Sequence, residues 1–142
     1  MENPISVLMT REIWTVGSED TIDKVEHLFA LHNLSVAPVV DEVGSLFGVI
    51  SSYDLLSFTA ARRNPRATRA WELCTYKPVA VGPDTPISHV ARIMLTNKMH
   101  HVLIVDDGQL KGIVSTLDFV KQCVPDMVNV GQSESQEPAT PL

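Results

Sequence analysis

A seven-residue pattern occurs twice in this chain of 142 residues, and it constrains the fold more than any other feature. The first copy runs from Gly48 to Asp54 and the second from Gly112 to Asp118. In each copy a glycine opens a short apolar run that ends in a serine, and an aspartate follows three positions after the serine. This pattern predicts a buried strand that passes directly into the first turn of a helix.

The similarity between the two copies extends well beyond this pattern. A shift of 65 residues places Val16-Gly17 on Val81-Gly82 and Val40-Asp41 on Val105-Asp106. After a one-residue deletion opposite Val43, a shift of 64 aligns the seven-residue patterns themselves. The chain is therefore an internal duplication, and each copy is one supersecondary unit.

Each copy predicts the order strand, helix, strand, strand, helix. The first copy should have a strand ending at 15–16, a helix starting near 21, strands over 36–40 and 46–50, and a helix after Ser51. The second copy should repeat this with a strand ending at 80–81, a helix whose first residue is Pro86, strands over 102–105 and 110–114, and a helix after Ser115. Apolar residues spaced as on one buried face support both first helices: Ile22, Val25, Leu28 and Phe29, and Ile87, Val90, Ile93 and Met94.

We divide the chain accordingly into four parts. Residues 5–60 form the first repeat and residues 75–124 the second. Residues 61–74 form an arginine-rich connector with a short helix over 68–73, and the tail 125–142 is polar enough to be expected disordered.

Composition narrows the class of protein. The sequence lacks an apolar run of the roughly 20 residues that a membrane helix needs, and the first residues do not resemble a signal peptide. Two distant cysteines, Cys74 and Cys123, predict no disulfide framework and favour a cytoplasmic location. The net charge of −6 argues against a general nucleic-acid-binding surface on the chain as a whole.

The repeated unit resembles the CBS (cystathionine-β-synthase) domain pair, or Bateman module. The resemblance covers about residues 5 to 124 and includes 7–10, 37–41 and 48–51 as well as the duplicated pattern. It implies an α+β fold with α/β-type packing, in which two repeats are related by a pseudo-twofold axis. It also implies two clefts for adenine nucleotides or related adenosyl compounds, and a homodimer that forms a disk of four repeats.

The resemblance implies a ribose-binding role for the duplicated serine and aspartate. By this interpretation Asp54 and Asp118 accept hydrogen bonds from ribose hydroxyls, and Ser51 and Ser115 add polar contacts. The alternative needs no ligand, because a serine followed three residues later by an acidic residue is also a capping box. The two interpretations are compatible, since a helix N-terminus also suits an anionic ligand.

Further residues are implied as phosphate and base contacts. His100 and His101 are the expected phosphate contacts of a nucleotide whose ribose lies on Asp54, and Ser35 occupies the equivalent place in the other repeat. Adjacent strand residues point to opposite faces, so one histidine can lie outside the cleft, and both can instead belong to a strand edge. The family's common arginine is missing here, and Ser35 predicts a second cleft for a less anionic ligand. The expected base pocket consists of Ile13, Trp14 and Thr15 in one copy and Pro78, Val79 and Ala80 in the other.

Alternatives remain for the aromatic and basic residues. Trp14 is either a base-stacking residue or an ordinary packed tryptophan. The connector arginines, Arg62, Arg63, Arg66 and Arg69, fit a solvated helix face as well as a polyphosphate or nucleic-acid contact.

We interpret the chain as a regulatory module, not an enzyme, because it contains no recognisable catalytic or metal-binding motif. Its expected ligand is AMP, ADP, ATP or S-adenosylmethionine, it requires no cofactor, and its regulated partner is another protein that the sequence does not identify. Two alternatives are a structural dimerisation module with empty clefts and a nucleic-acid-associated regulator.

Overall fold

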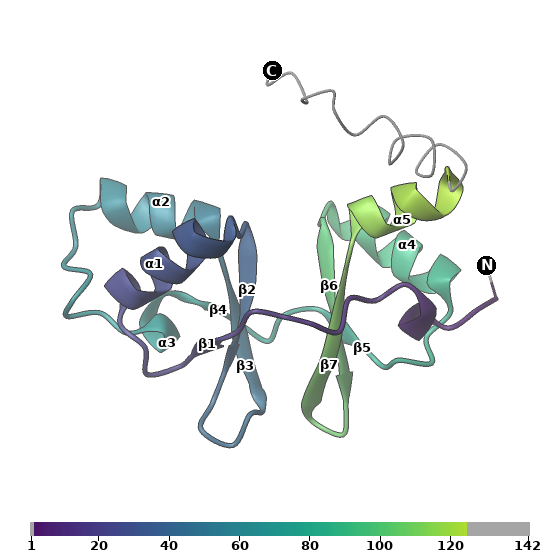
Figure 1. Ribbon diagram of the computed structural model, residues 1–142, viewed down its shortest axis with the longest axis horizontal. Helices are drawn as coiled ribbons and strands as arrows, with labels where there is room; N and C mark the ends of the chain where they lie inside the picture. Colours follow the sequence, from purple (N-terminus) through teal and green to yellow (C-terminus); the bar gives the residue numbers. More distant parts are fainter. Residues whose placement is uncertain (1, 125–142) are drawn as a thin grey trace.

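The computed structural model describes residues 2–124 and shows two similar halves side by side (Figure 1). The first half contains β1 (Val16–Gly17), α1 (Ile22–His32), β2 (Val36–Val40), β3 (Leu46–Ser51) and α2 (Ser52–Ala60). The second half contains β5 (Ala80–Val81), α4 (Ile87–Asn97), β6 (His101–Asp106), β7 (Gln109–Ser115) and α5 (Thr116–Cys123). Three short elements complete the described chain: η1 (Ile5–Val7), α3 (Ala70–Leu73) and β4 (Thr75–Tyr76). The duplicated strand-helix-strand-strand-helix order predicted from the sequence is confirmed.

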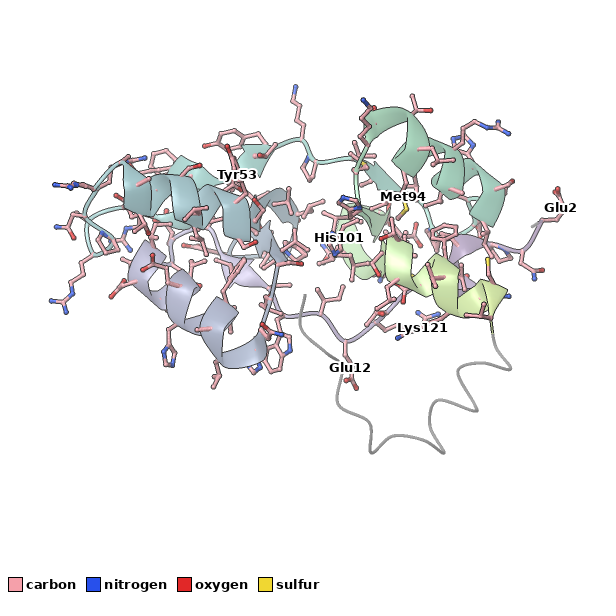
Figure 2. The ribbon with its side chains drawn as sticks, turned by 90° about the horizontal axis from the view of Figure 1, so that it is seen from above. Glu2, Glu12, Tyr53, Met94, His101 and Lys121 are labelled. Atoms are coloured by element: carbon pink, nitrogen blue, oxygen red, sulfur yellow. The ribbon has the colours of Figure 1, made fainter. Side chains whose placement is uncertain are left out.

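The strands form two sheets that lie next to each other in the middle of the molecule (Figure 1). The first sheet has the order β1-β2-β3-β4, with β1 parallel to β2 and the other pairs antiparallel. The second sheet has the order β5-β6-β7 with the same directions. The helices α1 and α2 of the first half and α4 and α5 of the second half lie on the same side of the molecule. Figure 2, the view from above, therefore shows them together. This is the pseudo-twofold α+β architecture expected for tandem repeats.

Each half has its own hydrophobic core, but the opening segment of each repeat packs in the other half. Ile5, which is fully buried, belongs to the core of the second half with Ile87, Val90 and Val114. Conversely, α3 and β4 close the sheet and the core of the first half, where Ala70 is fully buried. Each opening segment is therefore followed by a segment that crosses between the halves. The first crossing segment, residues 11–15, leads into β1 and the second, residues 77–79, leads into β5, and the N-terminal crossing is visible in Figure 1.

Both crossings depend on a glycine at the start of the duplicated pattern. A Cβ on Gly48 would lie 2.6 Å from the carbonyl oxygen of Thr75 in β4. A Cβ on Gly112 would lie 2.6 Å from Met9 Sδ and 3.0 Å from the carbonyl oxygen of Thr10. The backbone of the crossing segment thus approaches the sheet so closely that only glycine fits.

Three expectations differ from the structure in detail. Pro86 is the N-cap residue of α4 and not its first helical residue, because its ψ of 143° is extended. The short connector helix begins at Ala70 instead of Thr68. Residues 13–15 and 78–79 lie outside the strands, because they belong to the segments that run between the two halves before β1 and β5 begin. The expected disordered tail, 125–142, lies outside the described residues.

Candidate functional site

The duplicated serine and aspartate form the N-terminal caps of α2 and α5. In the first half the backbone N–H of Ser51 donates to Asp54 Oδ2 (2.8 Å), and the backbone N–H of Asp54 donates to Ser51 Oγ (3.1 Å). In the second half the backbone N–H and the hydroxyl of Ser115 both donate to Asp118 Oδ2, at 2.8 and 3.1 Å. The capping interpretation therefore describes the local geometry. Since the bonds from residues 2–124 to both carboxylates end on Oδ2, Oδ1 keeps its capacity to accept from a ligand.

One cleft, which we call the Asp118 cleft, lies where the crossing segment of the first repeat meets the second half. Its volume is about 340 Å³, a size that suits a small molecule. Asp118 and Ser115 form one wall and Ile13 and Trp14 another. The remaining lining residues are Thr10, Glu12, Asn33, Leu34, Ser35, Val36, His101, Ile113, Leu117 and Lys121. The structure thus gathers one predicted aspartate, Ser35, and Ile13 and Trp14 of one predicted base pocket around one cavity.

A second cleft, which we call the Lys77 cleft, occupies the equivalent place in the other half of the molecule. It has a volume of about 310 Å³ and contains the predicted base contacts Pro78 and Val79 and the predicted phosphate contact His100. Its other lining residues are Val36, Val49, Thr75, Lys77, Met99, His101 and Leu103. Each crossing segment therefore borders one of these two clefts, and the two are similar in size.

Some predicted site residues lie outside both clefts. Within residues 2–124, Asp54 and Ser51 line neither cleft, although their pseudo-equivalents Asp118 and Ser115 line the first. Thr15 and Ala80 also line neither cleft, because each lies next to or within the short strand where its sheet begins. The two halves thus differ in how closely their capping aspartate approaches a cavity.

His101 lines both clefts, as Val36 does, and it lies between the halves (Figure 2). Burial lowers the pKa of His101 from its usual 6.5, and neighbouring His100 lowers the pKa further, while Asp118 acts in the opposite direction. A lowered pKa favours the neutral imidazole, so near neutral pH this side chain offers one donor and one acceptor instead of a positive charge. At that pH His101 suits hydrogen bonding better than charge-based capture of phosphate.

Trp14 is half exposed at the Asp118 cleft and stacks on another ring. Its exposed fraction is 53%, and its ring centroid lies 3.6 Å from that of His32 with an interplanar angle of 14°. The indole is therefore held by one face while it lines the cleft. The side chain is thus packed on His32 and also borders a cavity, and its role in stacking on a base stays a prediction.

Sequence reasoning missed Glu12 and Lys77, which line the Asp118 and the Lys77 cleft respectively. The shift of 65 residues that aligns the repeats places these two residues on each other. A comparison of charge along the aligned copies would have found them.

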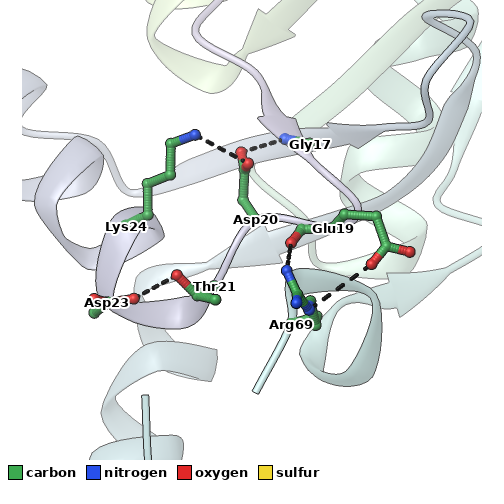
Figure 3. Close-up of polar contacts among 7 residues, drawn as sticks. All are labelled: Gly17, Glu19, Asp20, Thr21, Asp23, Lys24 and Arg69. Atoms are coloured by element: carbon green, nitrogen blue, oxygen red, sulfur yellow. Dashed lines mark hydrogen bonds and ion pairs between the residues drawn. The ribbon is translucent and has the colours of Figure 1, made fainter. Parts of the chain in front are cut away.

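Two of the connector arginines, Arg63 and Arg69, make contacts with residues of the first half. Arg69 donates from Nη1 to the carbonyl oxygen of Glu19 (2.6 Å) and makes a longer ion pair with the Glu19 carboxylate (3.9 Å; Figure 3). In the same close-up Asp20 accepts from the backbone N–H of Gly17 (2.8 Å) and from Lys24 (3.2 Å). Arg63 lies over the ring of Phe58 at 5.1 Å. The two contacts of Arg69 with Glu19 hold the connector against the first half.

Comparison with known proteins places these observations in context. The family model of the CBS domain matches residues 5–61 and 70–124. The chain is 28% identical over 111 residues to the CBS domain-containing protein YhcV of Bacillus subtilis, covering 78% of this chain and 79% of YhcV. It is also 30% identical over 123 residues to L-aspartate semialdehyde sulfurtransferase of Methanocaldococcus jannaschii, covering 84% of this chain but 23% of that protein.

Two similar solved structures contain adenosyl ligands. A crystal structure of CBSX2 in complex with AMP has a TM-score of 0.78 and 25% identity, covering 88% of this chain and 98% of that one. The CBS domain pair of MJ0100, in complex with 5′-methylthioadenosine and S-adenosylmethionine, has a TM-score of 0.77 and 25% identity, covering 89% of this chain and 99% of that one.

Proposed function

The chain belongs to the CBS domain family, and on that premise we propose that it is a regulatory module that binds an adenosyl ligand between its two halves. The Asp118 cleft is the observation that carries the proposal. It combines a carboxylate that keeps one oxygen available for a ribose with an aromatic side chain for a base, and its walls come from both halves. Structures of similar CBS proteins with AMP or S-adenosylmethionine support this ligand class.

The regulation follows from a cleft that both halves build. A ligand that contacts both repeats stabilises the relative orientation of the halves in which its contacts are best. The module acts through binding instead of catalysis, and a separate protein or a second copy of this module detects the change. Free cysteines at 74 and 123 are compatible with a cytoplasmic setting. No helix among residues 2–124 combines the length and apolar character needed to cross a membrane.

A binding screen tests the proposal directly. Isothermal titration calorimetry and thermal unfolding would be measured with AMP, ADP, ATP and S-adenosylmethionine at up to millimolar concentration. At 100 times its dissociation constant a ligand should stabilise the fold by about 2.7 kcal/mol. Heat of binding together with a raised Tm supports the sensor. If none of the four compounds gives either signal, the clefts bind no adenosyl ligand and the alternative of a structural module is favoured.

A second function, dimerisation, is favoured by apolar side chains on the exposed helix faces. Tyr53 and Leu56 of α2 are strongly exposed, and so are Leu117 and Val120 at the equivalent positions of α5. Exposed apolar residues that recur at equivalent positions suit a symmetric interface between copies. We propose that a second copy of the module covers these helices. Sedimentation velocity should show a dimer that the double variant Leu56→Lys, Val120→Lys converts to monomer, whereas a monomeric wild type contradicts the interface.

A further inference from the structure

The two clefts carry opposite charges at equivalent positions. Glu12 lines the Asp118 cleft, and Lys77, 65 residues later, lines the Lys77 cleft. Each residue lies on a crossing segment, so the backbone places both residues between the two halves in the same way. Two cavities of nearly equal size thus differ in the sign of the charge at this equivalent position.

The other charged residues reinforce this difference. The Asp118 cleft has two carboxylates, Glu12 and Asp118, against one ammonium, Lys121. Figure 2 shows Glu12 and Lys121 on the same side of the molecule, from different halves. In contrast, the described lining of the Lys77 cleft contains Lys77 and two histidines and no carboxylate. With His101 neutral the first cleft is therefore net negative, and the second is net positive whichever state its histidines take.

The backbone at Lys77 gives a second reason to single out this residue. Its φ of 52° lies in the left-handed region, which is unfavourable for a side chain with a Cβ. The equivalent residue, Glu12, is not one of the described residues with a positive φ. The crossing into the second half thus keeps a lysine where the backbone would favour glycine or asparagine, and this strained position lines a cleft.

We propose that the two clefts sort adenosyl ligands by the charge of their 5′ substituent. This inference rests on the proposed function and specifies it. The Lys77 cleft binds 5′-phosphorylated adenosine, because Lys77 and His100 attract the phosphate. The Asp118 cleft binds adenosyl compounds with a cationic 5′ substituent, such as a sulfonium or an amine, because Glu12 and Asp118 attract the cation and repel a phosphate.

Charge-reversal variants of the full chain test the sorting. Calorimetric titrations with AMP, with S-adenosylmethionine and with neutral adenosine would be compared for the wild type, Glu12→Lys and Lys77→Glu. Glu42→Lys and Lys111→Glu are matched controls, because both side chains are exposed and line neither cleft. Reversing a charge near the ligand should change its affinity roughly tenfold, and less in 0.5 M salt.

The expected pattern is specific to each probe. Lys77→Glu should weaken AMP binding about tenfold and leave S-adenosylmethionine binding unchanged, and Glu12→Lys should do the reverse. Adenosine affinity should change in neither variant, and the controls should behave as wild type. If both charged probes bind and neither charge reversal changes their affinities, the sorting is overturned but the proposed function stays intact. Absence of binding by all three probes overturns the proposed function and the sorting with it.

Discussion

Thr10 and Ile113 belong to different sequence repeats, yet their backbones are joined by a pair of hydrogen bonds. The N–H of Thr10 donates to the carbonyl of Ile113 at 2.8 Å, and the N–H of Ile113 donates to the carbonyl of Thr10 at 3.0 Å. This pair fixes the start of the first repeat to the sheet edge of the second half. From that anchor the chain crosses to β1, and the crossing places Glu12, Ile13 and Trp14 at the Asp118 cleft.

The anchoring predicts that a mutation near the N-terminus destabilises the second half. Ile5→Ala removes a fully buried side chain from the core that contains Ile87 and Val114, which should cost about 2–5 kcal/mol. Val7→Ala is the control, because Val7 is 62% exposed, and its effect should stay within about 0.5 kcal/mol. Urea unfolding measures both free energies. Equal stabilities of the two variants would contradict the packing of the N-terminal segment in the second half.

Gly48→Ala should destabilise the first half by about 1–3 kcal/mol, because its Cβ would meet the Thr75 carbonyl oxygen, a backbone atom that cannot move alone. Gly82→Ala is the matched control, since a Cβ there meets no atom within 4 Å. Thermal unfolding of both variants should show a lowered Tm for the first alone. A Gly48→Ala protein as stable as its control would mean that β4 does not lie so close to β3.

Asp118→Ala should weaken adenosyl binding at the Asp118 cleft by at least tenfold, because it removes a charged hydrogen-bond acceptor from the wall. Loss of the cap should itself cost about 1 kcal/mol of stability. Asp54→Ala controls for that loss, since Asp54 caps α2 in the same way but lines neither cleft among the described residues.

The fluorescence of Trp14 offers a local measurement of this binding, in a Trp71→Phe background that leaves one tryptophan. Ligand titrations should give a weakened dissociation constant for Asp118→Ala and an unchanged one for Asp54→Ala. If both variants weaken binding equally, the effect comes from helix capping and the assigned ribose contact is wrong.

His101 should make the fold less stable as the pH falls. Its pKa is lowered in the folded state, so below the unfolded value of about 6.5 the unfolded chain binds more protons and unfolding becomes easier. The charged groups that share its clefts are Glu12, Lys77, Asp118 and Lys121, with His100 adjacent. In His101→Gln the free energy of unfolding should therefore decline less between pH 8 and pH 5. Urea unfolding at each pH measures this, with pH 8 as the reference. Parallel curves for the two proteins would refute the lowered pKa.

The sequence alone determined the repeated architecture, because local patterns carry it. The short apolar strands, the apolar stripes of α1 and α4 and the Ser-x-x-Asp caps depend on residues close together in the chain. Gly48 and Gly112 open the repeated pattern at the same position in each copy. In the structure a chain segment, at Thr75 or at Met9 and Thr10, lies so close to each glycine that a Cβ would not fit.

Only the tertiary structure decided which residues share a cleft. Glu12 shares a cleft with Asp118, and Lys77 shares the other with His100, because each opening segment packs in the opposite half and then crosses back. A local pattern cannot specify such a pairing, since the two partners lie far apart in sequence and meet only when both cores have formed. For the same reason two aspartates with identical local caps differ, so that Asp118 borders a cavity and Asp54 does not.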